Sequence, residues 1–140
     1  MGVVDTQSID RVGPAGPWLQ AAEHVVVVDH HLGVVGDIDP DEVIVEPVGS
    51  ATTVLVERLH ALSGEPERLT LTETEATLFA LGIRADTGAL SFPATTPRDA
   101  YALAWLMEQG CSQSAIAEFG QVRRSTNGSS PSRTPLENIP

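Results

Sequence analysis

The chain has 140 residues, which is enough for one domain with a hydrophobic core but short for a two-domain enzyme. Its formal net charge of -11 excludes broad electrostatic attraction to nucleic-acid backbones, although carboxylates that hold divalent cations remain compatible with phosphate chemistry. No apolar stretch is long enough to span a membrane, no basic start resembles a signal peptide, and the single Cys111 cannot form an internal disulfide, so we expect a cytoplasmic protein.

Two short strands near the N-terminus are predicted to end on aspartates. Residues 3–5 have the pattern of the last part of one strand, and the four valines at 25–28 are typical of a central strand in a parallel sheet with both faces covered. The run of valines leads into Asp29, His30 and His31. Open α/β sheets carry their chemistry just beyond the carboxyl ends of such strands, so this triplet is the first candidate functional motif. The alternative is that the aspartate caps a turn and both histidines are surface residues.

A helical turn at residues 18–22 is expected between these two strands, and an acidic turn at residues 37–42 after them. An EF-hand calcium loop would need Gly at its sixth position and Glu at its twelfth, where this chain has Glu42 and Val48. We therefore interpret the acidic turn as a solvated loop. Residues 43–46 are then predicted to form another brief strand.

Three helices are predicted to follow. The first begins at Ser50 and places its apolar residues at helical spacing. The second covers residues 73–84 and opens with a capping box formed by Thr72 and Glu75. The third begins near Pro97. Its predicted apolar face consists of Ala100, Leu103, Ala104 and Met107.

The C-terminal part of the chain changes in composition. Ser112 is expected to cap a last short helix that reaches Phe119, whereas residues 125–140 are rich in Ser, Pro, Asn and Gly and lack apolar periodicity. We therefore expect one α/β domain over residues 1–119, with a Rossmann-like parallel sheet flanked by helices, and a disordered tail over residues 120–140.

The order of three motifs resembles the DHH phosphoesterase superfamily, which includes RecJ-like exonucleases. The motifs are Asp5, the triplet Asp29-His30-His31 and the stretch 82–90, which reads Gly-Ile-Arg-Ala-Asp-Thr-Gly-Ala-Leu. Residues 46–53 and 95–100 look most like DHH domains fused to CBS modules and a tRNA nucleotidyltransferase, so a fused or partner nucleotidyltransferase is expected. The resemblance implies metal-dependent hydrolysis of phosphodiester bonds. The candidate substrates are nucleic acid, short oligonucleotides and cyclic dinucleotides.

The same resemblance implies a role for each motif residue. In the family two divalent cations, Mn²⁺ or Mg²⁺, clamp a phosphate while a bridging water attacks phosphorus. Asp5 matches the aspartate that binds both cations, and His30 and Asp86 match ligands of one of them. His31 matches the histidine that contacts the phosphate. Asp29 is then expected to orient His30 through a hydrogen bond to the other ring nitrogen, as metal-bound histidines require.

The chain departs from the family in its first motif. A His followed by an Asp-x-Asp on a strand before Asp5 is absent from the sequence, and so is the C-terminal substrate-binding domain. Because that motif supplies ligands to both cations, we expect a truncated fragment that binds one cation weakly. Asp37 and Asp39 have the right spacing but lie in a turn after the triplet.

Two alternatives stay open at this point. The chain could be a non-catalytic fragment of a DHH-containing tRNA nucleotidyltransferase that acts as a binding or structural module. The stretch 86–89, Asp-Thr-Gly-Ala, is also the signature of aspartic proteases, in which two such aspartates share a proton across a dimer. Those enzymes are nearly all β, however, whereas this stretch follows a capped helix.

Overall fold

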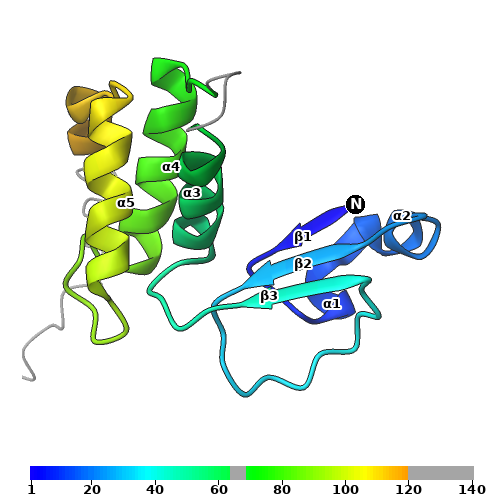
Figure 1. The fold of residues 1–140 in the computed structure, drawn as a ribbon. Helices are drawn as coiled ribbons and strands as arrows, with labels where there is room; N and C mark the ends of the chain where they lie inside the picture. Colours follow the sequence, from blue (N-terminus) through cyan, green and yellow to red (C-terminus); the bar gives the residue numbers. More distant parts are fainter. Residues whose placement is uncertain (64–68, 120–140) are drawn as a thin grey trace, which may run out of the picture.

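A computed structural model describes residues 1–63 and 69–119, and it has the α/β architecture expected from the sequence (Figure 1). Three strands form a parallel sheet in the spatial order β1-β2-β3. Their bounds are β1 Gly2–Val4, β2 Val26–Asp29 and β3 Glu42–Val45. The predicted central position of the valine strand is therefore confirmed, since β2 pairs with a neighbour on each side.

The helices fall into two groups. Between β1 and β2 the chain forms three short elements, which are α1 Ile9–Val12, the 3-10 helix η1 Gly13–Ala15 and α2 Gly16–Gln20. After β3 it forms α3 Ala51–Leu62, α4 Glu73–Asp86 and α5 Pro97–Glu108, and residues 113–119 are also helical. Within the described ranges, no helix is long and apolar enough to cross a membrane. The disorder predicted for residues 120–140 lies outside the described residues.

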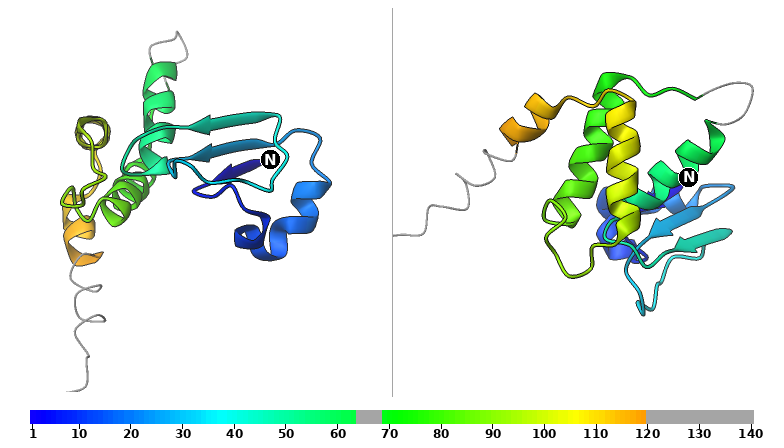
Figure 2. Two further views of the ribbon diagram at one scale, coloured as in Figure 1. Left: turned by 90° about the horizontal axis from the view of Figure 1, so that it is seen from below. Right: turned by 60° about the vertical axis from the view of Figure 1, so that its left-hand side comes forward.

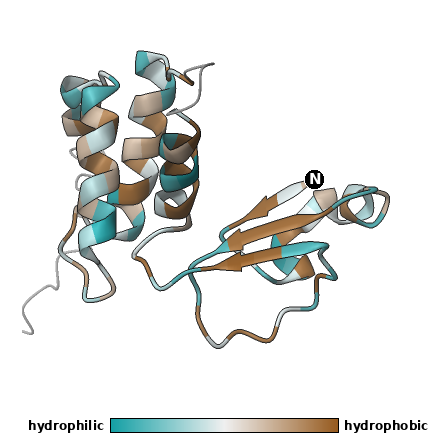
Figure 3. Cartoon of the chain, in the orientation of Figure 1, coloured by the Kyte–Doolittle hydropathy of each residue, from teal (hydrophilic) through white to brown (hydrophobic). Residues whose placement is uncertain are grey.

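Val27 and Val28 lie on opposite faces of β2 and both are buried, as the run of valines predicts, and Figure 3 colours most of this strand hydrophobic. Side chains alternate across a strand. Val27 therefore packs with Val3 and with Leu19 of α2 on one face, whereas Val28 packs with Val54 of α3 on the other. The left view of Figure 2 shows α1 and α2 on one side of the sheet and α3 at the carboxyl ends of its strands. Each fully buried valine contributes about 1.5–3 kcal/mol to stability, so this strand anchors the site at its carboxyl end.

A second core lies among α3, α4 and α5. Val56, Ala80, Ile83 and Leu106 are buried there, and the small alanines allow the helices to approach closely. The predicted capping box of α4 is present, because the Glu75 amide donates to the Thr72 hydroxyl and the Glu75 carboxylate accepts from the Thr72 amide. This three-helix group holds the end of α4 beside the segment that follows β3.

The predicted apolar face of α5 is wrong. The helix buries Ala102, Trp105 and Leu106 against α3 and α4, together with Asp99 at its start. Ala100, Ala104 and Met107 are exposed and Leu103 is only partly buried. α5 carries apolar residues on two adjacent faces, and the periodicity alone does not distinguish them. Burial of the large Trp105 side chain decides the orientation, because aromatic residues dominate core energetics.

Candidate metal centre

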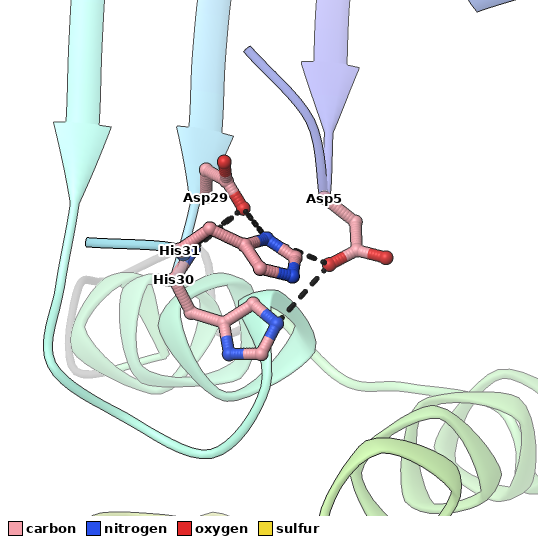
Figure 4. A group of neighbouring side chains, drawn as sticks. All are labelled: Asp5, Asp29, His30 and His31. Carbon is pink, nitrogen blue, oxygen red and sulfur yellow. Dashed lines mark hydrogen bonds and ion pairs between the residues drawn. The ribbon is translucent and has the colours of Figure 1, made fainter. Parts of the chain in front are cut away.

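Asp5 lies at the carboxyl end of β1, where the backbone turns sharply. Its φ is +67°, in the left-handed region that Asp tolerates better than most residues, and its amide donates to the Val28 carbonyl at 3.0 Å. Such strained positions concentrate at functional sites. The turn brings the half-exposed Asp5 carboxylate beside the end of β2, as Figure 4 shows.

Asp29 is the buried anchor of the triplet, with 1% of its surface exposed. Its carboxylate accepts from Gln7 Nε2 at 2.8 Å, from the His30 amide at 2.8 Å and from His31 Nδ1 at 2.7 Å. Burial by itself would raise the pKa of this carboxyl, but the hydrogen bonds from Gln7, His31 and the two histidine amides outweigh burial and lower the pKa. Asp29 is therefore an ionised group that fixes the loop carrying both histidines.

His30 is held with one ring nitrogen directed at Asp5. Its Nδ1 lies 3.1 Å from the Val48 carbonyl, which can only accept, so Nδ1 carries a proton, and in the neutral ring Nε2 keeps its lone pair. Nε2 lies 3.2 Å from Asp5 Oδ1. Two acceptors at this distance repel each other unless a proton or a cation lies between them. Two ligands bound at right angles to one cation, with bonds of about 2.1 Å, would stand about 3 Å apart.

The prediction that Asp29 forms a hydrogen bond with the ring of His30 is wrong. The Asp29 carboxylate instead accepts from the ring of the neighbouring residue, His31. The backbone carbonyl of Val48 takes the place expected of Asp29 on His30. The reason is local geometry: Asp29 also accepts from the His31 amide at 3.3 Å, so the chain wraps around its carboxylate and brings the second histidine back to it. The His31 side chain remains 44% exposed, with Nδ1 3.8 Å from Asp5 Oδ1.

Four side chains thus converge on one point. Asp5, Asp29, His30 and His31 each offer a ligand atom, and these atoms all lie within 4.8 Å of one another. A carboxylate oxygen beside an imidazole nitrogen is a donor set that suits divalent transition-metal cations. Because Asp29 is already occupied by hydrogen bonds, Asp5 and His30 are the two groups best placed to bind a cation directly. The residues present therefore fit a metal.

Asp86 lies outside this group of four among the described residues. It is the last residue of α4, and its Oδ2 accepts a 2.8 Å hydrogen bond from the Ser50 hydroxyl. Ser50 follows Val48 by two residues, and Val48 holds His30. The structure therefore links Asp86 to the triplet through residues 48–50 rather than by direct contact.

Three supporting residues escaped the sequence reasoning. Gln7 braces Asp29, and the same Gln7 nitrogen donates to the His31 carbonyl at 3.0 Å. Ser50 and Asp99 lie in the stretches 46–53 and 95–100 that carry the family resemblance, and near the starts of two predicted helices, but the sequence pattern assigns a contact to neither. A Gly-Ser pair directly before a helix that follows a strand was the available signal for a loop that approaches the site. Nothing in the sequence indicated Gln7.

The chain is similar in sequence and fold to several known proteins. The chain is 38% identical over 118 residues to an A-adding tRNA nucleotidyltransferase of Geobacter sulfurreducens, covering 84% of the chain and 13% of that protein. It is 37% identical over 98 residues to the cyclic-di-AMP phosphodiesterase GdpP of Bacillus subtilis, covering 69% of the chain and 14% of that protein. A crystal structure of a putative family II inorganic pyrophosphatase from Methanococcus jannaschii matches with a TM-score of 0.62 at 26% identity, covering 86% of the chain and 39% of that structure. No family model matches the chain.

Fold and site together define an α/β domain with a candidate metal centre at the carboxyl edge of a parallel sheet. The chain belongs to the DHH phosphoesterase superfamily, as its three motifs predict. It spans only 13–14% of the length of the curated relatives described above.

Proposed function

We propose that this chain is a metal-dependent phosphoesterase domain that hydrolyses phosphodiester bonds. The observation that carries the proposal is the 3.2 Å approach of His30 Nε2 to Asp5 Oδ1, while the Val48 carbonyl occupies the other ring nitrogen of His30. Asp5 and His30 would hold Mn²⁺ or Mg²⁺, and Asp86 would complete the ligand set. A cation bound at this position would lower the pKa of a water molecule and polarise a phosphoryl oxygen.

His31 has a different role in this proposal. Its Nδ1 is bonded to the buried Asp29, so the ring is fixed, and its other nitrogen could donate a hydrogen bond to a phosphate oxygen when the ring is protonated. Asp29 acts through His31 by holding the ring in place. Gln7 in turn holds Asp29, so the phosphate-binding histidine rests on a buried and fully bonded support.

The substrate we propose is an oligonucleotide or a cyclic dinucleotide. The relative from Bacillus subtilis is named a cyclic-di-AMP phosphodiesterase, and the one from Geobacter sulfurreducens a tRNA nucleotidyltransferase. Both names refer to nucleotide phosphates. With a net charge of -11, the chain lacks broad attraction for a long phosphate backbone, which favours a short substrate held by a cation.

We also propose that residues 1–119 form a partial DHH domain, whose second cation needs ligands from the family's first motif. Among the described residues β1 is an edge strand, because it pairs only with β2. The free side of β1 is where a strand carrying His-x-x-x-Asp-x-Asp could pair. On this view the chain alone would bind one cation weakly.

Hydrolysis of bis-p-nitrophenyl phosphate with Mn²⁺ tests the proposed activity. We expect the 140-residue chain to act only slightly above background, because a two-metal mechanism needs both cations. Adding an N-terminal strand with His-x-x-x-Asp-x-Asp should raise the rate by orders of magnitude. Asp86→Ala in that longer protein should abolish the gain, whereas His24→Ala, which alters an exposed histidine paired with Asp41, should not. No gain on adding the strand, together with a silent Asp86→Ala, would show that the chain is not a phosphoesterase of this type.

A second candidate function is a binding or structural module within a tRNA nucleotidyltransferase. This function is favoured because 84% of the chain aligns with part of a protein named an A-adding tRNA nucleotidyltransferase. The same hydrolysis assay separates the two functions. A module of this kind would gain no activity from the added strand, yet it would bind Mn²⁺ as long as Asp5 and His30 are intact.

A further inference from the structure

Residues 48–50 connect β3 to α3, and each of the three uses a different group to hold another part of the molecule. The Val48 carbonyl binds His30 Nδ1 at 3.1 Å. The Gly49 amide donates to both oxygens of Asp99, at 3.1 and 3.0 Å. The Ser50 hydroxyl donates to Asp86 at 2.8 Å. All three residues are buried, so this short segment is a fixed link between the triplet, α4 and α5.

The Ser50 hydroxyl is fully used in this arrangement. Its oxygen accepts from the Thr52 amide at 3.1 Å and so caps the N-terminus of α3. A hydroxyl has only one proton to donate, and Ser50 donates it to Asp86 Oδ2. A hydrogen bond to a carboxylate is about twice as strong as one between neutral groups, so it restricts where the carboxylate can point.

Asp86 itself occupies an unfavourable position for a carboxylate. It is the last residue of α4, and the C-terminus of a helix carries partial negative charge, which repels an anion. Its second oxygen accepts no hydrogen bond from the described residues. Asp86 is exposed, so a cation could reach its second oxygen without displacing another protein group.

The segment cannot easily shift, because Gly49 is packed tightly. A Cβ at this position would lie 2.7 Å from Cγ2 of Thr87 and 2.9 Å from Oδ2 of Asp99. Thr87 is the neighbour of Asp86 in the chain, and its side chain is fully buried. Close packing of Gly49 against Thr87 thus fixes Ser50 relative to the end of α4.

We propose that Ser50 is a positioning residue that holds Asp86 by one oxygen, so that the other can bind the cation held by Asp5 and His30. The inference rests on the proposed function, because it assigns Asp86 to the metal centre. The carbonyl of Val48, two residues before Ser50, holds one ring nitrogen of His30 in the same way and leaves the other for the cation. One rigid segment then sets two ligands that come from distant parts of the sequence.

Calorimetric titration of the full chain with Mn²⁺ tests whether Ser50 positions Asp86. Removing a group that orients a metal ligand costs about 10–100-fold in affinity, and we expect a loss of this size in Ser50→Ala. Thr72→Ala is the matched control, because Thr72 caps α4 with its hydroxyl but holds no candidate ligand. It should leave Mn²⁺ affinity unchanged within about twofold, although each variant loses one N-cap.

A double-mutant cycle separates positioning from general loosening of the fold. If Ser50 acts through Asp86, then Ser50→Ala should have no further effect on Mn²⁺ affinity in an Asp86→Ala background. Equal losses in both backgrounds would overturn the inference, as would wild-type affinity in Ser50→Ala. If Ser50→Ala is silent while Asp86→Ala and His30→Ala weaken binding, the inference fails and the proposed metal centre stands. Absence of Mn²⁺ binding by the unmodified chain would overturn both.

Discussion

Substituting His30 with alanine is expected to abolish Mn²⁺ binding, with a loss in affinity of more than about 100-fold. Removing a group that only orients a metal ligand lowers metal affinity by up to about 100-fold. The loss should be larger for His30, because His30 is proposed to be a ligand itself. Its Nε2 lies 3.2 Å from Asp5 Oδ1, and the two residues come from different strand ends. Removing the imidazole leaves Asp5 half-exposed and without its partner. Isothermal titration of the wild-type chain should show about one site of modest affinity, and His30→Ala should show none.

His24→Ala is the matched control for this experiment. His24 is also a histidine close to an aspartate, with Nδ1 3.3 Å from Asp41, but both side chains are more than half exposed. This pair lacks the buried support that Asp29 and Val48 give to the triplet. The control should bind Mn²⁺ like the wild type. Unchanged binding in His30→Ala, or two tight sites in the wild type, would show that the cation is held by other residues.

Substituting Asp99 with alanine is expected to lower the free energy of unfolding by about 3 kcal/mol or more. The Asp99 carboxylate is fully buried and accepts from the Gly49 amide, the Thr53 hydroxyl, and both the amide and the hydroxyl of Thr96. Each buried donor left without a partner costs about 1–3 kcal/mol. The total free energy of unfolding of a domain is only about 5–15 kcal/mol, so the variant should be close to unfolding. Urea denaturation followed by circular dichroism measures the loss.

Glu75→Ala is the matched control for Asp99→Ala. Glu75 holds the same third position in the capping box of α4 that Asp99 holds in α5, but Glu75 is exposed. Water can replace its hydrogen bonds when it is removed, so the loss of stability should be much smaller. Equal losses in the two variants would show that Asp99 contributes only as a helix cap and does not hold residues 49–53 in place.

The contribution of Asp99 should also depend on pH in a defined direction. Burial would raise the pKa of its carboxyl, but the hydrogen bonds from Thr53, Thr96 and Gly49 outweigh burial and lower the pKa. A group with a lowered pKa in the folded state stabilises the protein above its unfolded pKa of about 3.9. That stability is lost as the pH falls through the lower folded value. The stability difference between wild type and Asp99→Ala should therefore be constant near pH 7 and shrink below about pH 4.

The sequence was sufficient to predict the parts of the site that depend on local pattern. Four valines before Asp29 indicate a buried parallel strand, and the carboxyl end of such a strand is where functional side chains gather. The structure confirms this strand and brings Asp5 to the triplet from the neighbouring strand. The capping box at Thr72 is equally local, and the structure confirms it as well.

Contacts between distant residues were beyond sequence reasoning. Asp99 binds Gly49 across 50 positions of sequence, and Asp86 binds Ser50 across 36. Periodicity and spacing carry no information about such pairs, because they arise only when α4 and α5 pack against α3. The predicted hydrogen-bond partner of Asp29, His30, is wrong for a related reason. A choice between adjacent histidines depends on the turn that the chain makes after the strand, and no residue pattern specifies that turn.

Crystals soaked in Mn²⁺ and measured at the manganese absorption edge test the central claim most directly, because anomalous scattering locates the cation without reference to activity. The account predicts an anomalous peak at the carboxyl ends of β1 and β2, about 2.1 Å from His30 Nε2 and from an oxygen of Asp5. It predicts no comparable peak beside His24 and Asp41. A soaked crystal with no peak between Asp5 and His30, or with manganese bound only elsewhere, would contradict the assignment of this site as a metal centre.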